Sequence, residues 1–444
     1  MNWRKPLLAL FYSTHYNTMK KYRLLNKIFY SDSRTIKEFQ LDKIKQLLIY
    51  SDNNVPYYSK VLRECGVING KDKVCLENFS SIPFLTKDII RDNFSELQST
   101  TRLKGEYRDT SGGSTGEPVQ FIHSKLYWEW SMANKFLFDK FIGKDIGELE
   151  LRVWGSPSDL AGTESLKSKL NMFLHNQKMF NAYCITEQSI LQLIHLFNKL
   201  KPTFVKFYVE TAYEIAKLIE AHSIPVHHPL VLSSCAGTLH DWSRKKISEQ
   251  FQTRVRNNYG SREVGDIAIE CSEHNLHISD MTQLVEIIKE NGEPAEEGET
   301  GEIVITLLTE YSMPLIRYKI GDMAIRGANC PCGNCSSTFK HVIGRNSDNF
   351  YSKSKGIIYG EYFNVLFYHK SWIRKFQIIQ NDYQDLTLKV ELKESRIPPS
   401  DKTNIENACK FVLGDETIIH WVIMDSIPPT PSGKYRYTIS NVTR

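Results

Sequence analysis

The stretch PLVLSSCAG at residues 229–237, followed by DWSRKKISEQF at residues 241–251, indicates the fold class of this chain of 444 residues. The first part is a short apolar run that ends in small residues, as buried strands often do, and the second has the apolar spacing of a helix. A further strand-like segment, LELRVWG, and a helical one, EQSILQLIHLFNKL, precede them. Strands alternating with helices favour a mainly parallel sheet covered by helices. We therefore expect an α/β protein.

The segments on either side of this stretch predict two domains. Strand-like segments dominate residues 277–327, where NGE is typical of a hairpin turn, and residues 33–65 are predicted to be helical with an end near residues 53–56. Strand-like segments near the C-terminus predict a smaller α/β unit, preceded by the predicted linker GRNSDNFYSKSKG. We therefore predict a large N-terminal domain of helix-covered sheets over residues 1–345 and a small mobile C-terminal domain over residues 346–444.

Composition limits the class of protein. The formal net charge is only +5, so bulk charge does not indicate a nucleic-acid partner. No apolar run approaches the roughly 18 residues that a transmembrane helix requires. The first apolar patch is too short for a signal peptide, and the nine cysteines are odd in number and irregularly spaced, which favours a reducing compartment. A cytoplasmic location is the expectation.

The N-terminal segment has a local charge bias. Its residues before Asp32 include no acid, and its basic residues alternate with aromatic ones. The basic residues are Arg4, Lys5, Lys20, Lys21, Arg23 and Lys27. Two interpretations remain open: the segment lies peripherally on an anionic membrane, or its helix docks on its own domain with a solvated basic face. The second is the more ordinary and is favoured.

A glycine-rich loop precedes the strand-like sequence VQFIH. It comprises Ser111, Gly112, Gly113, Ser114, Thr115 and Gly116. Clustered glycines let backbone N–H groups approach an anion, and the hydroxyls add donors for phosphate oxygens. No lysine follows the last glycine, which excludes the P-loop of nucleoside triphosphatases. The loop is either a phosphate site or a flexible linker, and the strand that follows it favours the phosphate site.

Three more segments carry residue types suited to nucleotide chemistry. In NYGSRE at residues 258–263, Tyr259 can cover a purine face and Glu263 can ligate Mg²⁺. In MPLIRYKIGD, the final Asp322 can accept the hydroxyls of a ribose. In PPTPSGKYRY, Lys434 can neutralise charge that develops on a phosphate. Each has an ordinary alternative when taken alone, namely a core tyrosine, a surface carboxylate, a turn residue or a solvated lysine.

In this order, these segments resemble the adenylate-forming enzymes, most closely the phenylacetate–CoA ligase-like branch that includes capsular-polysaccharide biosynthesis proteins. The matching stretches are SGGSTGEPV, NNYGSREVGDIAIEC, TGEIVITLLTEYSMPLIRYKIGD, IGRNSD and TPSGKYRY, with SDNNVPYYSKVL and IPFLTKDIIRDNF nearer the N-terminus. They cover nearly the whole chain. The resemblance implies the acyl-adenylate-forming fold, in which the small C-terminal domain moves as a lid.

The resemblance also implies roles for single residues. The loop from Ser111 to Gly116 would grip the phosphates of ATP, and Glu263 would bind Mg²⁺. Lys434 would reach the carboxylate and the α-phosphate. The nucleotide would further contact Ala236, Gly237, Asn258, Tyr259, Gly260, Ser261, Asp322 and Arg345, and Asp348 would be the hinge.

The activity implied by the resemblance is ATP-dependent conversion of a carboxylic acid to its acyl-AMP, with release of pyrophosphate. The acyl group would then pass to CoA or to another nucleophile, in polysaccharide biosynthesis for the capsule-related members. Two alternatives remain open. One is acyl or aminoacyl transfer to a sugar amine or hydroxyl without CoA. The other is a non-catalytic module that binds nucleotide or is held together by zinc.

Cysteines and histidines cluster in CSEHNLH at residues 271–277 and CPCGNC at residues 330–335. Structural zinc prefers four sulfur and imidazole ligands from two such short clusters. We predict Cys271, His277, Cys330 and Cys332 as the ligands, a set similar to one that related ligases carry. His274 and Cys335 are competing candidates, and ordinary reduced thiols are the alternative to a metal site.

Overall fold

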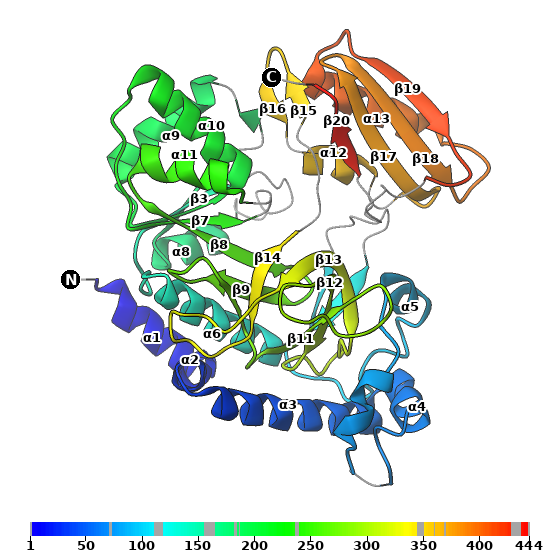
Figure 1. Cartoon of the computed structure of the whole chain (residues 1–444). Coiled ribbons are helices and arrows are strands. Elements are labelled where there is room, and N and C mark those ends of the chain that lie inside the picture. Colours follow the sequence, from blue (N-terminus) through cyan, green and yellow to red (C-terminus); the bar gives the residue numbers. More distant parts are fainter. Residues whose placement is uncertain are drawn as a thin grey trace. The chain divides into compact units, whose positions relative to one another are not determined.

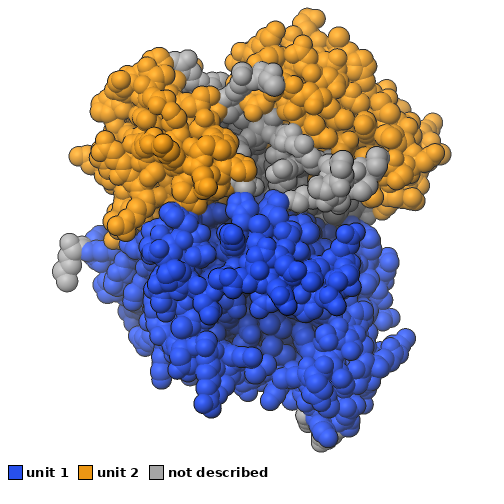
Figure 2. All heavy atoms as spheres, viewed as in Figure 1, with its two compact units in different colours: residues 1–111, 119–147, 256–344 blue, residues 112–118, 148–255, 345–444 orange. Residues whose placement is uncertain are grey.

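The computed structural model describes residues 2–70, 73–110, 119–154, 165–181, 184–185, 187–235, 239–343, 350–358, 360–367, 370–427 and 437–442. The chain forms two compact units (Figure 2). The first comprises residues 1–111, 119–147 and 256–344, and the second comprises residues 112–118, 148–255 and 345–444.

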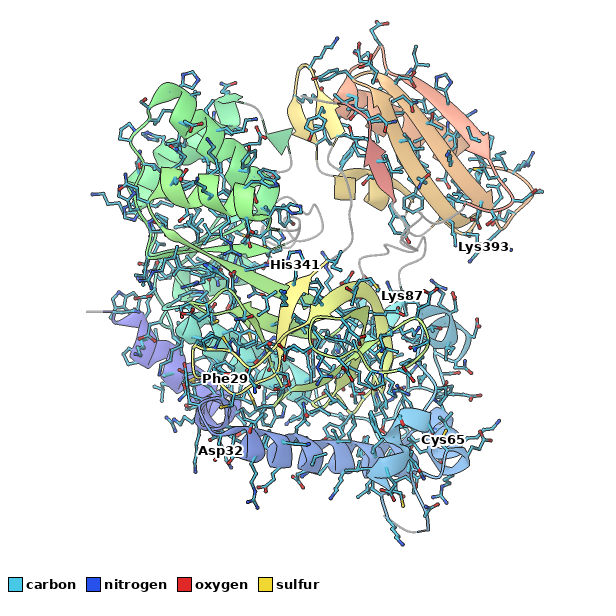
Figure 3. The ribbon with its side chains drawn as sticks, in the orientation of Figure 1. Phe29, Asp32, Cys65, Lys87, His341 and Lys393 are labelled. Carbon is cyan, nitrogen blue, oxygen red and sulfur yellow. The ribbon has the colours of Figure 1, made fainter. Side chains whose placement is uncertain are left out.

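Helices of the first unit come mostly from the N-terminal part of the chain (Figure 1). They are α1 (Arg4–Thr14), α2 (Thr18–Phe29), α3 (Ser33–Asn54), α4 (Pro56–Glu64), the 3₁₀ helix η1 (Leu76–Ser81), α5 (Lys87–Asp92) and α6 (Lys125–Phe141). Asp32 caps α3, because its side chain accepts a hydrogen bond from the backbone N–H of Thr35 at 2.7 Å. Figure 3 labels Asp32 and also Phe29, the last residue of α2. The predicted helix over residues 33–65 is divided at Val55, because the residue before Pro56 is extended.

Strands of the first unit form an antiparallel sheet in the order β11-β12-β13-β14-β10-β9-β8 and a small hairpin. The strands are β1 (Tyr107–Thr110), β2 (Gln120–His123), β8 (Arg254–Ser261), β9 (Gly265–Glu270), β10 (Leu276–Ile278), β11 (Gln283–Ile288), β12 (Thr300–Leu307), β13 (Tyr318–Arg326) and β14 (Thr338–Val342). The turn predicted at NGE lies between β11 and β12, which pair antiparallel as expected.

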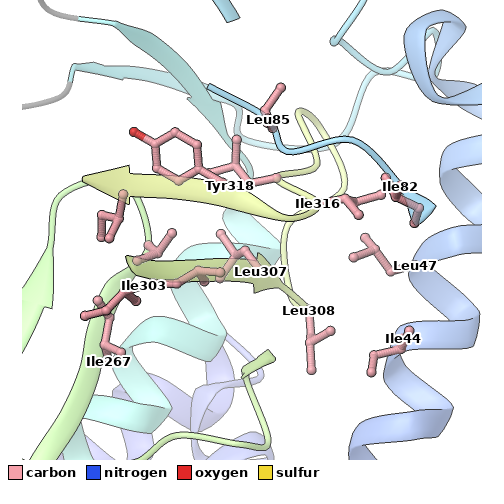
Figure 4. Packing of buried hydrophobic residues seen from close by; sticks show 14 of the residues in the cluster. Ile44, Leu47, Ile82, Leu85, Ile267, Ile303, Leu307, Leu308, Ile316 and Tyr318 are labelled. Carbon is pink, nitrogen blue, oxygen red and sulfur yellow. The ribbon is translucent and has the colours of Figure 1, made fainter. Parts of the chain in front are cut away.

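The core of the first unit joins this sheet to the N-terminal helices. Ile44 and Leu47 of α3 pack beside Leu308 and Ile316 (Figure 4). All four side chains are at most 4% exposed. Complete burial of such a side chain contributes about 1.5–3 kcal/mol relative to its exposure to water. Burial of this size explains why residues more than 250 positions apart form one layer.

The parallel sheet expected from the sequence lies in the second unit, in the order β7-β6-β3-β4. Its elements, with the short strand β5, are β3 (Glu150–Trp154), α8 (Leu166–Leu174), β4 (Gln177–Asn181), β5 (Cys184–Ile185), α9 (Glu187–Leu200), β6 (Phe204–Tyr208), α10 (Val209–His222), β7 (Val231–Cys235) and α11 (Asp241–Phe251). Apolar residues of α9, α10 and α11 share one core with the strands. The strand–helix reading of residues 229–251 is therefore confirmed.

The C-terminal part of the second unit has its own sheet, in the order β19-β18-β17-β20. Its elements are β15 (Phe350–Ser352), β16 (Gly356–Ile358), α12 (Gly360–Phe367), β17 (Ile373–Asp382), β18 (Asp385–Leu392), α13 (Pro399–Leu413), β19 (Ile418–Ile423) and β20 (Thr438–Ser440). A single core joins this sheet to α12 and α13.

The prediction of a linker at GRNSDNFYSKSKG is wrong for its last residues, because residues 350–358 form a hairpin. The buried side chain of Gln380 holds its first strand by exchanging hydrogen bonds with the backbone of Tyr351, at 3.0 and 2.7 Å. The second strand pairs with β5. The polar sequence of this segment suggested a linker, because its partner Gln380 is distant in the chain and cannot be recognised from the local pattern. The domain boundary at residue 345 stays a prediction.

No helix in the described part of the chain is long and apolar enough to cross a bilayer. The cytoplasmic location stays a prediction.

Candidate nucleotide and metal sites

Tyr259 and Asp322 come together although 63 positions separate them. The phenol of Tyr259, on β8, donates a hydrogen bond to Oδ2 of Asp322, on β13, at 2.8 Å. The tyrosine ring also packs edge-on against Phe339, with ring centroids 5.9 Å apart. Asp322 is only 8% exposed. Two of the motifs that the sequence analysis singled out therefore meet in one place.

The strand around Tyr259 admits only a glycine at the next position. A Cβ on Gly260 would lie 2.6 Å from the carbonyl oxygen of Gly265, closer than real contacts allow. The ladder to β9 is also irregular between Tyr259 and Gly260. The glycine thus lets two backbones approach closely. Beside it, the buried hydroxyl of Ser261 has no hydrogen-bond partner among the described residues.

Glu263 is a buried carboxylate in the connection between β8 and β9, and it is 4% exposed. Within the described ranges it makes no hydrogen bond or ion pair. A carboxylate is a ligand type that Mg²⁺ accepts. Glu263 therefore fits the role of a magnesium ligand.

The other predicted nucleotide and catalytic residues lie outside the described residues. These are Ser111, Gly112, Gly113, Ser114, Thr115, Gly116, Ala236, Gly237, Arg345, Asp348 and Lys434. Asn258, which is described, lies on β8 opposite Ile269 of β9. The assigned roles of all these residues stay predictions.

The four predicted zinc ligands converge. One ligand atom each from Cys271, His277, Cys330 and Cys332 lies within 4.8 Å of the others. The Cys271 and Cys330 sulfurs are 3.5 Å apart, and the Cys332 sulfur is 3.2 Å from Nε2 of His277. Metal–ligand lengths of about 2.0–2.3 Å in a tetrahedron require separations of this size.

The two competing ligands are engaged elsewhere. Nδ1 of His274 lies 2.6 Å from a carboxylate oxygen of Glu270, and Cys335 is exposed with its sulfur 3.8 Å from the Gly333 carbonyl. The ligand atoms of the four residues named first therefore lie together without these two, and their role as zinc ligands stays a prediction.

Hydrogen bonds around His277 fix which ring nitrogen carries its proton. The side-chain amide of Asn334 donates to the Phe29 carbonyl at 2.7 Å, so its oxygen faces Ser336 and accepts the serine hydroxyl at 2.6 Å. That hydroxyl has one proton, so it must accept from Nδ1 of His277, which is 3.1 Å away. Nε2 is then left with a lone pair on the cysteine side, as metal binding requires.

Burial keeps the imidazole neutral. Loss of solvation lowers the pKa of His277 to about 4, and burial raises the pKa of the Cys271 thiol to about 12. A neutral imidazole is ready to bind a metal, whereas a thiol must first lose its proton. The sequence analysis missed Ser336 and Asn334, and their only signal was their place beside Cys335.

Arg317 is an anchor that the sequence analysis also missed. Its guanidinium makes two hydrogen bonds to Glu286, at 3.1 and 3.0 Å, and donates to the carbonyls of Ser80 and Ile82. Its own carbonyl accepts the N–H of Leu85 at 2.9 Å. It therefore ties the segment before α5 to the start of β13, the strand that carries Asp322.

Similarity to known proteins covers most of the chain. Residues 350–441 match the CapK C-terminal domain family. The chain is 27% identical to the protein CapK of Staphylococcus aureus, over 97% of this chain and 93% of that protein. It is 23% identical to a phenylacetate–coenzyme A ligase of Thermus thermophilus, over 81% and 82% of the two chains.

A solved structure shares the fold. It is 2-hydroxyisobutyryl-CoA ligase in complex with 2-HIB-AMP and CoA, in the thioesterification state. The TM-score is 0.62 at 17% identity, over 93% of this chain and 91% of that one. The predicted α/β class and the acyl-adenylate-forming fold are thereby confirmed.

Proposed function

Since the chain belongs to the phenylacetate–CoA ligase-like branch of the adenylate-forming ligases, we propose that it activates a carboxylic acid as its acyl-AMP and passes the acyl group to CoA. A carboxylate is a poor electrophile because its leaving group would be oxide. When a carboxylate oxygen bonds to the α-phosphorus of ATP, pyrophosphate leaves and a mixed anhydride forms. The thiol of CoA then attacks the acyl carbon, and AMP leaves.

One observation carries the proposal: the hydrogen bond between Tyr259 and Asp322 unites two of the nucleotide motifs. In the proposed complex Asp322 accepts the ribose hydroxyls, and the ring of Tyr259 covers the adenine. The 2.8 Å bond to the tyrosine holds the carboxylate in one orientation before nucleotide binds. Such preorganisation lowers the cost of ordering the site.

Glu263 would hold Mg²⁺, which supplies positive charge to the phosphate oxygens of ATP. The residue belongs to the same motif as Tyr259, is 4% exposed and has no cationic partner in the described part of the chain. The hydroxyl-rich loop from Ser111 to Gly116 would supply further donors to the phosphates, and Lys434 would neutralise the charge that develops at the α-phosphate.

The direct test is ATP–pyrophosphate exchange with a panel of aromatic, aliphatic and amino acids. We expect acid-dependent exchange, and thioester formation when CoA is added. Binding of ATP without exchange for any acid would contradict the proposal and favour a non-catalytic nucleotide-binding or zinc-held module. Exchange without thioester would instead favour transfer to a sugar amine or hydroxyl.

Glu263→Gln should raise the Mg²⁺ concentration needed for half-maximal exchange by at least about 10-fold, because the variant removes a charged oxygen ligand. The measurement is exchange at saturating ATP and acid across a magnesium titration. Glu297→Gln, which changes an exposed carboxylate in the connection before β12, is the control and should leave the titration unchanged. Equal titrations for both variants would remove the assignment of Glu263.

The sugar acceptor is a second candidate for the transfer step. It comes from the resemblance to the capsule-related members of the branch and stays a prediction. In that case a sugar amine or hydroxyl attacks the acyl carbon of the acyl-AMP and AMP leaves, as a step in polysaccharide biosynthesis. Product analysis with CoA and with an amino sugar, each in excess, distinguishes the two acceptors.

The cysteine and histidine cluster would hold a structural zinc ion. The ligand separations, the sulfur-rich set and the orientation of His277 by Ser336 all support this assignment. Four protein ligands leave no position for a substrate, so the ion would serve folding rather than catalysis.

Metal analysis of the purified protein should find about one zinc ion per chain, as expected for a closed four-ligand site. Cys332→Ser should lose most of the zinc and lower the unfolding temperature, because metal binding contributes to folding free energy. Cys335→Ser is the matched control, since the same substitution three positions away should change neither value. Full zinc content in Cys332→Ser would contradict the ligand assignment.

A further inference from the structure

We propose that helices α1 and α2 form a binding surface for anionic lipid membranes. The surface has two parts, an apolar row formed by the N-cap residue Trp3 with Leu7 and Leu10 of α1, and a basic face on α2 (Lys20, Arg23 and Lys27). The inference is independent of the proposed enzymatic reaction.

Helix α1 is apolar on two opposite sides. It buries Leu8 and Tyr12, which are 2% and 3% exposed, against its own unit. The apolar row faces the other way, because residues at positions i, i+4 and i+7 share one side of a helix. Its three side chains are 52%, 43% and 62% exposed. The unit therefore covers only one of the two apolar sides of α1 and leaves the other exposed.

Helix α2 is anchored in the same manner but exposes charge. Leu25 and Phe29 are fully buried, while the basic face is exposed to water. None of the three cations of the basic face makes an ion pair with any described residue. Leu24 and Tyr30, which are 39% and 56% exposed, border this face.

The remaining charges explain why a lipid surface is the best occupant. Lys5 pairs with Asp145, and Lys21 pairs with Glu129, so these two cations stabilise the protein itself. No acidic residue precedes Asp32, so nothing in the segment offsets the basic face. Anionic headgroups complement such a face, and apolar side chains with an interfacial tryptophan insert beside them.

The helices would lie in the plane of the membrane surface. Helix α1 has 11 residues, which at 1.5 Å per residue gives about 16 Å, roughly half of the hydrocarbon thickness. Tyr12 also anchors α1 to the protein through ring contacts with Trp128 and Phe136. Only the outward side of the helix is therefore available to lipid.

Cosedimentation of the full chain with vesicles tests the proposal. We expect binding to phosphatidylcholine vesicles that contain about 30% phosphatidylglycerol, weaker binding at high salt, and little binding to phosphatidylcholine alone. Neutralising the basic face with Lys20→Gln, Arg23→Gln and Lys27→Gln should weaken binding about 100-fold, since each charge near an anionic surface contributes a factor of about 5.

Changing the apolar row with Trp3→Ser, Leu7→Ser and Leu10→Ser should weaken binding at least about 10-fold through lost apolar burial. The matched control is Leu166→Ser, Leu170→Ser and Phe173→Ser on α8. These side chains have the same spacing and are 86%, 60% and 54% exposed. Loss of binding in this control, equal binding to both vesicle types, or no binding at all would overturn the proposal. The proposal would also be overturned if the unchanged chain bound no vesicles and instead formed a dimer that the apolar-row substitutions convert to a monomer.

Discussion

Lys434→Ala is expected to lower ATP–pyrophosphate exchange about 100- to 1,000-fold, the usual cost of removing one group that stabilises transition-state charge. The lysine would neutralise charge on the α-phosphate as the carboxylate attacks. The same variant should form thioester from supplied acyl-AMP at a rate within about twofold of the unchanged protein, because the lysine would be withdrawn when the C-terminal domain rotates for the second step.

The control is Lys402→Ala, which removes an exposed lysine of α13 and leaves the charge of the C-terminal region equal to that of the test variant. It should leave both half-reactions unchanged. Unchanged exchange in Lys434→Ala would refute the role of the lysine. Equal loss in both half-reactions would instead place the lysine in binding of the adenylate, rather than in its formation.

Arg317→Ala is expected to destabilise the first unit by about 3–5 kcal/mol, the usual cost of removing one partner from a buried ion pair. The side chain of Arg317 is 5% exposed, and that of Glu286 is 18% exposed. Burial already raises the pKa of Glu286, although the guanidinium opposes this change. Without the arginine the carboxylate is left buried and unpaired, and the carbonyls of Ser80 and Ile82 lose their donor.

Urea-induced unfolding measures this loss. Lys319→Ala, two residues along the chain, breaks an ion pair with Glu302 whose side chains are 31% and 29% exposed. Because such partly exposed pairs contribute little, we expect a change of at most about 1 kcal/mol. Arg317→Lys keeps the charge but not the paired hydrogen bonds, so its stability should lie between these two variants. Equal effects of Arg317→Ala and Lys319→Ala would show that the pair is not an anchor.

The alternation of apolar runs with amphipathic segments was sufficient to predict the parallel sheet of the second unit. Residues 229–251 form β7 and α11 as expected, because each segment buries one apolar face whatever its neighbours are. The hairpin at NGE is equally local, since its turn residues lie side by side in the chain. Local patterns thus predicted these strands, this helix and this turn.

Pairings between distant residues could not be predicted in this way. Gln380 gives no sign in the sequence that it will hold Tyr351, so a segment expected as linker is a strand. Arg317 likewise looks like one basic residue among many. Both depend on a partner that the fold brings near, and a one-dimensional pattern carries no information about that partner.

The predicted zinc ligands depend on both the local sequence pattern and the fold. Residue type and spacing were sufficient to predict the cluster, because cysteines and histidines concentrated in two short segments are typical of structural zinc sites. The choice between His274 and His277 required the fold, since it depends on which side of a hairpin each ring occupies. His277 lies on β10, paired with Ile269, whereas His274 lies in the turn with a positive φ and contacts Glu270. The sequence determines which ligand types are present, whereas the direction of each side chain is fixed only when the strands pair.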